Sequence, residues 1–386
     1  MTRILWVSPT ISAAFGGPTT TTVNGLVAET RAGLESSLIS TTSGGDEAKV
    51  APALSRLSAD GVDVKLFPRT SLLAKAEAWG FSPRMAIWMI RNLRKFDVIH
   101  LQYVWCMSSI CGSILGKLYG IPVVITPHES LTDYDLDVAS RSRIKRRVKL
   151  ILRRLYLRTA DRLVFMSDLE RWDTDSGRTP FELIFHAVQE ATVPVKPSES
   201  SGDEQTLRIA FLGRNIPKKG IDLIIKALGR NPERNWSLYI AGPPGPDEYI
   251  KEVQDLAEHL GVASKVHWLG FLDERQELFR QIDVLTMPSV YEGFGMVAAE
   301  AMCYGVPVIV PRRSGVAEIV SQCEAGIVIP DSTVESLDEA LRELDDFPDR
   351  RDIYGANGVL AANSHLSYEA YSTATTALYE SLRAES

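Results

Sequence analysis

Short apolar, β-branched runs alternate with helix-length segments along almost the whole chain, and this alternation limits the possible folds more than any other feature. Strands that alternate with helices pair in parallel and are covered on both faces, so the pattern predicts an α/β protein with two doubly wound parallel sheets. The strands expected in the first half are Arg3–Ser8, Ser37–Thr41, Val62–Leu66, Val98–Leu101, Pro122–Thr126 and Arg162–Met166. Those expected in the second half are Leu207–Leu212, Ser237–Ala241, Lys265–Trp268, Val284–Met287, Pro307–Val310 and Gly326–Ile329.

A stretch of linker composition divides this pattern into two domains. Glu190–Gln205 contains two prolines, no aromatic residue and little apolar content. A chain of 386 residues is also too long for one ordinary core and suits two domains of roughly 180 residues each. We therefore expect domains at 1–190 and 206–366.

The overall composition excludes several classes of protein. With 42 basic and 49 acidic residues the net charge is −7, which argues against general binding of nucleic acid. No apolar run is long enough to span a bilayer, so any membrane contact is expected to be peripheral. The start of the chain lacks the charged and hydrophobic regions of a signal peptide. The four cysteines form no CxxC pair, which is typical of buried free thiols in a reducing cytoplasm, where we expect the protein to be.

The strongest chemical signal is the segment 288–302, PSVYEGFGMVAAEAM, where a strand ends, a loop with glycines follows and a helix begins near Gly295. Free backbone N–H groups at a helix start attract a diphosphate, and glycines let the phosphate approach the backbone. Glu300, on the helix, can accept hydrogen bonds from two ribose hydroxyls, and Glu292 at the loop tip is free to contact a sugar. Taken singly each glutamate is an ordinary solvated charge, but the combined pattern favours a nucleotide-sugar site.

A second signal is the turn 211–220, FLGRNIPKKG, between the first strand of the second half and a helix that begins at Ile221. The guanidinium of Arg214 and the ammonium of Lys219 can converge on one pyrophosphate and stabilise a leaving nucleotide. Lys218 can share this role. The alternative is a set of basic side chains in a solvated turn.

Two features of the first half are weaker on their own. Gly16 and Gly17 stand between the first strand and a threonine-rich helix start, where they can also be simple turn residues. His128 follows the strand Pro122–Thr126, and the carboxyl ends of parallel strands are where α/β folds place functional groups. A histidine at a strand end is nevertheless more often structural.

The spacing of Glu292 and Glu300, followed by Gly305-Val306-Pro307, resembles the E-x7-E signature of the large family of retaining GT-B glycosyltransferases. That family includes many bacterial mannosyl- and glucosyltransferases of surface polysaccharide synthesis, and the resemblance extends over nearly the full length. It implies two Rossmann-like domains facing across a cleft, with the acceptor held by the first and the donor mostly by the second. It also implies that the last helix, 367–384, packs back on the first domain.

The resemblance gives each motif of the second half a role. The first glutamate of the family signature faces the donor sugar and the second holds the ribose, which implies these roles for Glu292 and Glu300. Arg214 and Lys219 correspond to the family's pair of diphosphate-binding cations. The phosphates and the sugar would meet the backbone of Gly293, Phe294 and Gly295.

The motifs of the first half also acquire roles from the resemblance. A Gly-Gly loop approaches the donor diphosphate in the family, which implies this role for Gly16 and Gly17. The family has a histidine beside the sugar, which corresponds to His128, although Gly or Asp often follows it where this chain has Glu129. His100, in a strand-end pattern whose second histidine is replaced by Gln102, is interpreted as a packing residue.

The expected activity is transfer of a hexosyl group from a UDP- or GDP-sugar to a glycan, lipid-linked or small-molecule acceptor, with retention of anomeric configuration. No cofactor and no metal are expected. The runs Asp133–Asp137 and Asp173–Asp175 resemble the D-x-D metal motif of another glycosyltransferase fold, but neither follows a strand, and loop or capping aspartates are the better interpretation. The six histidines show no metal-ligand spacing.

The segment 141–158 is an exception to the acidic composition. Ile144, Val148, Ile151 and Leu155 recur at helical spacing and leave a strongly basic opposite face. This face is either an ordinary solvated surface or one that lies against anionic lipid or the pyrophosphate of an acceptor.

Two other functions stay open on the sequence alone. A nucleotide-sugar epimerase shares the double Rossmann fold and would convert the donor without an acceptor. A non-catalytic subunit would bind the nucleotide sugar without turnover, even with acceptors present.

Overall fold

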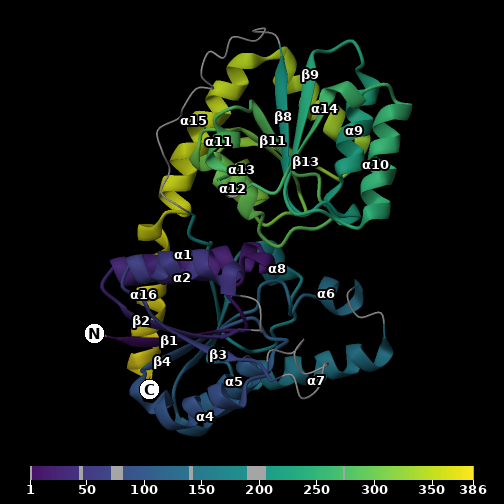
Figure 1. The fold of residues 1–386 in the computed structure, drawn as a ribbon. Helices are drawn as coiled ribbons and strands as arrows, with labels where there is room; N and C mark the ends of the chain where they lie inside the picture. Colours follow the sequence, from purple (N-terminus) through teal and green to yellow (C-terminus); the bar gives the residue numbers. More distant parts are fainter. Residues whose placement is uncertain are drawn as a thin grey trace. The chain divides into compact units, whose positions relative to one another are not determined.

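The computed structural model describes residues 2–42, 47–70, 81–138, 142–188, 206–272 and 274–385. Two units are distinguished, one formed by residues 1–187 and 368–386 and the other by residues 188–367 (Figure 1). Each unit contains one sheet in which all strands pair in parallel, so the predicted pair of doubly wound parallel sheets is confirmed. The linker expected at 190–205 lies outside the described residues.

The sheet of unit 1 has seven strands in the order β3-β2-β1-β4-β5-β6-β7. A core on one face packs against α1, α2 and α16, and a second core packs against α4, α5 and α7 on the other face (Figure 1). The strands are β1 (Arg3–Ser8), β2 (Glu35–Thr42), β3 (Asp63–Pro68), β4 (Val98–Gln102), β5 (Val123–Thr126), β6 (Arg162–Phe165) and β7 (Phe181–Leu183). The helices are α1 (Gly17–Arg31), α2 (Glu47–Ala59), α4 (Pro83–Asn92), α5 (Met107–Tyr119), α6 (Asp133–Val138), α7 (Arg143–Thr159), α8 (Asp168–Trp172) and α16 (Tyr368–Glu385).

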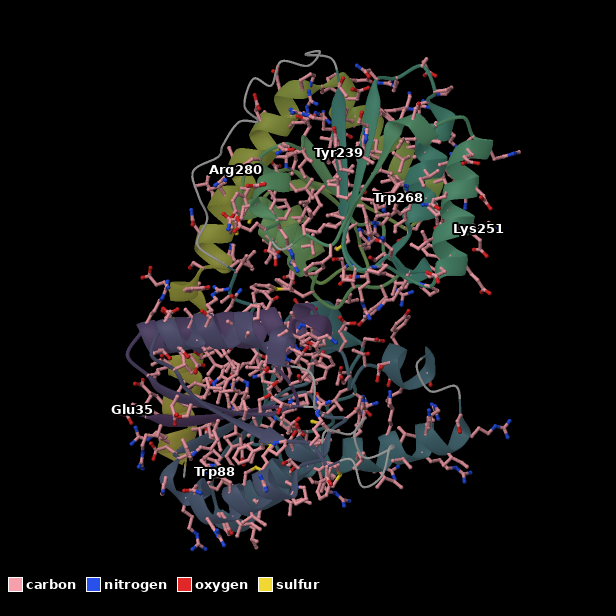
Figure 2. The ribbon with its side chains drawn as sticks, viewed as in Figure 1. Glu35, Trp88, Tyr239, Lys251, Trp268 and Arg280 are labelled. Atoms are coloured by element: carbon pink, nitrogen blue, oxygen red, sulfur yellow. The ribbon has the colours of Figure 1, made fainter. Side chains whose placement is uncertain are left out.

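Unit 2 repeats the same topology with six strands in the order β10-β9-β8-β11-β12-β13. Side chains fill the interior beside the sheet, while Lys251 projects outward from α10 (Figure 2). The strands are β8 (Leu207–Leu212), β9 (Trp236–Ala241), β10 (Val266–Gly270), β11 (Val284–Thr286), β12 (Val308–Pro311) and β13 (Gly326–Ile329). The helices are α9 (Ile221–Arg230), α10 (Asp247–His259), α11 (Gln276–Phe279), α12 (Met296–Cys303), α13 (Ala317–Gln322), α14 (Val334–Asp346) and α15 (Pro348–His365).

The strand order reverses direction once in each sheet, between β1 and β4 in unit 1 and between β8 and β11 in unit 2. Loops that leave neighbouring strands on either side of such a switch point diverge and leave room for a ligand at the carboxyl ends of the strands. These loops contain Gly16 and Gly17 in unit 1, and Arg214, Lys219 and Glu292 in unit 2. Among the described segments, no helix is both long and apolar enough to span a membrane.

Helix α16 packs along α1 through a buried polar network. Glu29, on α1, is fully buried and accepts hydrogen bonds from Trp6 Nε1 (2.9 Å), Ser36 Oγ (2.5 Å) and the Tyr379 hydroxyl of α16 (2.7 Å). Burial is the main cause that raises the pKa of Glu29 to about 7. The carboxyl group therefore fastens α16 to the first strand and first helix of the unit.

His100 extends this network to β5. Its Nδ1 lies 2.7 Å from the Tyr379 hydroxyl and its Nε2 lies 2.8 Å from Thr126 Oγ1. Burial lowers the pKa of His100 to about 3, so the ring is neutral at physiological pH. Both ring nitrogens are occupied inside the core, as a packing role requires.

Glu29→Gln should flatten the pH dependence of stability. The folded pKa lies above that of the unfolded carboxyl, so the folded chain retains a proton between about pH 4.5 and 7, and the free energy of unfolding falls as the pH rises through this range. The contribution of one such group is on the order of 3 kcal/mol. Glutamine keeps an acceptor oxygen and removes the titration, and urea denaturation below and above the range measures the change.

The control for this experiment is Glu35→Gln, because Glu35 is exposed at the start of β2 (Figure 2). It should leave the slope of stability against pH as in the parent. Equal slopes in the parent and in the Glu29 variant would contradict the role given to Glu29.

Candidate functional site

Two loops at the carboxyl ends of β8 and β11 bring Lys219 and Glu292 together. The Lys219 ammonium donates a hydrogen bond to the Glu292 carboxylate, and both side chains are largely buried. The two loops are in close contact at Gly220, whose φ is +73°. A Cβ at this position would lie only 2.5 Å from the Pro288 carbonyl oxygen, so a side chain would not fit there. An ammonium has three donors, so Lys219 can hold Glu292 and still donate to a phosphate.

The loop that carries Glu292 is shaped by Gly295, which precedes the first turn of α12. Its φ of +101° is unfavourable for other residues, and a Cβ would lie 2.9 Å from the Met287 side chain and 3.0 Å from that of Val316. The carbonyl oxygen of Phe294 accepts hydrogen bonds from the Val316 N–H (2.6 Å) and the Ser314 hydroxyl (3.2 Å). The segment after β12 therefore supports the loop, a contact that no local motif in the sequence predicts.

Glu300 lies on α12 and is held by Arg275, which precedes α11. Nη1 of Arg275 donates to both carboxylate oxygens of Glu300, at 2.9 and 3.1 Å. A carboxylate accepts about four hydrogen bonds, so Glu300 keeps acceptor capacity for a ligand. Arg275 was not predicted from the sequence, because nothing near it in the chain marks it as the partner of a residue 25 positions away.

Arg214 is exposed in the turn after β8, and its side chain has no ion pair or hydrogen bond within the described segments. The structure thus pairs Lys219 with Glu292 and leaves the Arg214 guanidinium available. Two further glycines, also missed, allow the loop after β9 to pack on this turn. A Cβ on Gly242 would lie 2.0 Å from the carbonyl oxygen of Gly213, and one on Gly245 would lie 1.5 Å from that of Asn215.

His128 lies in a ladder of rings at the carboxyl ends of the unit 1 strands. It stacks on Tyr103 (ring centroids 4.9 Å apart) and on His186 (5.4 Å), and exposed Phe15 lies 4.9 Å from Tyr103. Its Nε2 lies 2.7 Å from Oε1 of Gln102. Burial lowers the pKa of His128 to about 3, so the ring is neutral at physiological pH.

A buried carboxylate supports the turn at His128. His128 and Glu129 both have left-handed backbone angles, with φ of 51° and 66°, which costs roughly 1–2 kcal/mol for each residue. The Glu129 N–H donates to Glu170 (2.6 Å), whose other oxygen accepts from the Met166 N–H (3.0 Å). Burial raises the pKa of Glu170 to about 7. Glu170 was not singled out from the sequence, and it compensates the strain of Glu129.

Gly16 and Gly17 differ in what the fold requires of them. Gly16 caps α1 with φ of +74° and ψ of −136°, a conformation that favours glycine. Around Gly17, no heavy atom of the described chain lies within 4 Å of a Cβ position. Packing therefore does not explain Gly17, and the backbone at the start of α1 is left uncovered.

The basic helix α7 turns its apolar stripe, and not only its basic face, toward solvent. Its apolar stripe faces outward, since Ile144 is 75% and Ile151 64% exposed and Val148 is also exposed. The basic side chains opposite this stripe face α6, because they form ion pairs with the aspartates of the D-x-D-like run. These pairs are Arg146–Asp137, Lys149–Asp135 and Arg153–Asp133, at 2.7–2.9 Å. These three basic side chains are therefore paired within unit 1 and are not free to contact lipid.

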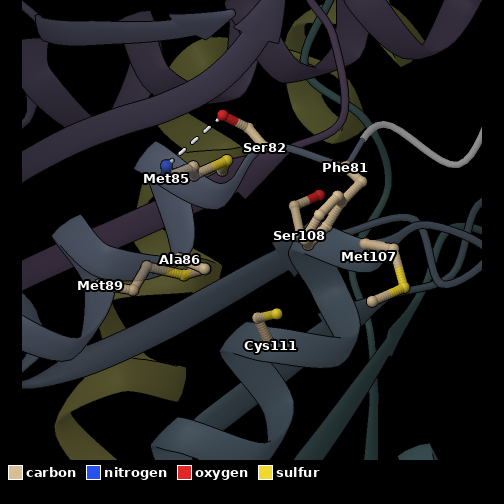
Figure 3. Close-up of a pocket in the computed structure, with 8 residues that line it drawn as sticks. All are labelled: Phe81, Ser82, Met85, Ala86, Met89, Met107, Ser108 and Cys111. Carbon is tan, nitrogen blue, oxygen red and sulfur yellow. Dashed lines mark hydrogen bonds between the residues drawn. The ribbon is translucent and has the colours of Figure 1, made fainter. Parts of the chain in front are cut away.

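A small cavity of about 10 Å³ lies between α4 and α5 (Figure 3). Such a volume holds at most one water molecule, so the cavity is a gap in the core and not a substrate site. The residues that line it are Phe81, Ser82, Met85, Ala86, Met89, Met107, Ser108 and Cys111.

Comparison with known proteins relates both parts of the chain to glycosyltransferases. Residues 16–174 match the glycosyl transferase 4-like domain, and residues 195–359 match the glycosyl transferases group 1. The uncharacterized glycosyltransferase MJ1607 of Methanocaldococcus jannaschii is 36% identical over 175 residues, which are 44% of each chain, so the match spans less than half of that relative. The D-inositol 3-phosphate glycosyltransferase of Corynebacterium glutamicum is 29% identical over 322 residues, 78% of this chain and 75% of the relative.

A solved structure supports the fold. The chain is similar to HepE of Anabaena in complex with UDP and glucose, with a TM-score of 0.78 and 18% sequence identity. The similarity covers 99% of this chain and all of that one.

Glu170→Ala should loosen the turn at His128. The change leaves the buried N–H of Met166 and the half-buried N–H of Glu129 without an acceptor, at a cost of up to about 1–3 kcal/mol each. We expect faster amide hydrogen exchange at both positions and a lower free energy of unfolding. Glu182→Ala, at an exposed position of β7, is the control. Unchanged protection of the Glu129 amide would show that Glu170 does not hold the turn.

Proposed function

The chain belongs to the group 1 glycosyltransferases, and we propose that it transfers a hexosyl group from a UDP- or GDP-sugar to a glycan, lipid-linked or small-molecule acceptor with retention at the anomeric carbon. The observation that carries the proposal is the pairing of Lys219 with Glu292 at the start of α12, in the same unit as Glu300 and Arg275. The complex of HepE with UDP and glucose supports a nucleotide-sugar donor.

In unit 2 the donor is proposed to lie over the start of α12. The N–H groups there, with Lys219 and Arg214, would bind the diphosphate and stabilise the charge that develops on the leaving nucleotide. Glu300, oriented by Arg275, would accept hydrogen bonds from the ribose hydroxyls. The backbone of residues 293–295 would contact the phosphates and the sugar.

The chemistry is proposed to need no metal and no covalent intermediate. Glu292 is held by Lys219, so it is better suited to binding a sugar hydroxyl than to attacking the anomeric carbon. A front-face displacement, in which the donor phosphate helps to deprotonate the acceptor, then relies on positioning and charge stabilisation. Within unit 1, neutral His128 would hydrogen-bond a sugar hydroxyl, and Gly16 and Gly17 would contact a diphosphate.

A peripheral membrane contact is part of the same proposal, and α7 is the element that supports it. Ile144, Val148 and Ile151 form an exposed apolar ridge at helical spacing, and arginines flank it. A helix with such a ridge lies in the interface of an anionic membrane. The protein would then work at the inner face of the membrane on a lipid-linked acceptor of polysaccharide synthesis.

Glu300→Gln should weaken nucleotide binding and transfer. The amide removes a charged acceptor, and such hydrogen bonds are worth about 1.5–3 kcal/mol, so the Kd for UDP or GDP should rise roughly 10- to 100-fold. Calorimetry measures binding, with exposed Glu339→Gln of α14 as the control. Unchanged affinity would remove Glu300 from the ribose site.

The reaction itself is tested by proton NMR of the products with nucleotide sugars and glycoside acceptors in the presence of EDTA. Retention appears as the same anomeric configuration in donor and product. Inversion, or activity that requires added magnesium or manganese, would contradict the mechanism. Donor conversion without an acceptor would identify an epimerase.

Replacing Ile144 and Ile151 by serine should reduce sedimentation with anionic vesicles by about tenfold or more, since burial of each side chain contributes roughly 1.5–3 kcal/mol. The matched control is Ile114→Ser with Leu118→Ser, a pair of exposed apolar residues on α5 of the same unit. If both double variants sediment like the parent, the ridge does not enter the membrane.

A further inference from the structure

A depression of about 380 Å³ lies at the carboxyl-terminal end of α7. Arg154 and Arg158 of α7 line one side, and Arg178 lies in the segment 176–180 that lines the other. Helix α7 leads into the start of β6, and this segment leads into the start of β7. The depression is therefore at the amino-terminal edge of the sheet, whereas His128 and Gly16 follow the carboxyl ends of strands.

The three arginines are exposed. Their side chains form no ion pair and no hydrogen bond within the described part of the chain. The neighbouring Arg153, by contrast, contacts Asp133 (2.9 Å) and Asp175 (3.8 Å). Three like charges around one depression repel one another, and a bound anion relieves this repulsion. A guanidinium matches a phosphate group in bidentate geometry, so phosphate is the anion that this site fits.

Two exposed aromatic side chains lie near the segment 176–180, which lines one side of the depression. Phe181 directly follows Pro180 of its lining, and the Arg171 guanidinium lies over the rings of Phe181 (4.7 Å) and Trp172 (4.3 Å). Trp172 is 75% exposed. Tryptophan with a neighbouring arginine is typical of the boundary between lipid headgroups and acyl chains.

The depression also continues the apolar ridge of α7. Arg154 and Arg158 follow Ile151 by three and seven residues, which places them on its side of the helix. When the ridge is buried among acyl chains, these two arginines lie at its end, where headgroup phosphates would be.

We propose that the arginine depression binds the phosphate of an anionic phospholipid headgroup. This inference rests on the proposed membrane contact of α7 and adds a defined headgroup site to it. A lipid is favoured over a soluble phosphate ester, because the ridge and Trp172 offer apolar contacts that a soluble ligand would not use.

The test is the double variant Arg158→Gln with Arg178→Gln, which removes one arginine from each side of the depression. Sedimentation with vesicles of phosphatidylcholine and phosphatidylglycerol should fall by at least about tenfold. Arg84→Gln with Arg91→Gln, exposed on α4 of the same unit, is the matched control because it removes the same charge and should sediment like the parent. Arg158→Lys with Arg178→Lys keeps the charge without bidentate geometry and should give an intermediate loss.

Several outcomes would overturn the inference. Equal losses in the glutamine variant and its control would mean that only net charge matters. Calorimetric binding of inorganic phosphate that the glutamine variant abolishes, with vesicle binding unchanged, would assign the site to a soluble ligand. If the Ile144 and Ile151 variant loses vesicle binding while the glutamine variant does not, the membrane contact of α7 is supported and the headgroup site is rejected. Affinity for UDP or GDP, measured on the same variants, reports separately on the transferase proposal.

Discussion

Parallel pairing of β1 with β4 in unit 1, and of β8 with β11 in unit 2, is the constraint on which the candidate site residues of each unit depend. A parallel strand has to be entered from the same end as its neighbour, so every loop that follows a strand emerges at one edge of the sheet. At the switch point two such loops diverge and leave their backbone groups uncovered. These loops contain Gly16 in unit 1, and Arg214, Lys219, Glu292 and Gly295 in unit 2. Glu300 lies in α12, the helix that follows one of them.

The carboxyl groups below the protein surface have different hydrogen-bond partners in the two units. In unit 2 each carboxylate of the candidate site has a cationic partner, Lys219 or Arg275, which fixes its orientation. In unit 1 Glu29 and Glu170 are buried without such partners and are held by uncharged donors, which leaves their pKa values near 7. These carboxyl groups shape the scaffold and the turn at His128.

The sequence predicted the sheets well because long alternating patterns report on burial directly. The residues given a site role, among them Glu292 and Glu300, were predicted from local motifs, because a strand, a glycine loop and a helix follow one another in the chain. The three-residue strand β7 was missed, since so short a segment has no periodicity. Which face of α7 meets a neighbour could not be predicted, because periodicity shows that a helix has two faces but not which one is covered. The ion pairs with α6 determine which face of α7 is covered, and they form only in the folded unit. The roles of Arg275 and Glu170 likewise depend on tertiary contacts that local sequence does not show.

The position of α16 in the chain affects the order in which the two units can complete their folding. Residues 368–385 complete the core of unit 1, yet they follow the whole of unit 2 in the chain. During synthesis the first 187 residues leave the ribosome while Glu29 and His100 still lack the hydroxyl of Tyr379. Unit 2 is continuous in sequence and can fold as soon as it has emerged. Unit 1, although translated first, is the last to be finished.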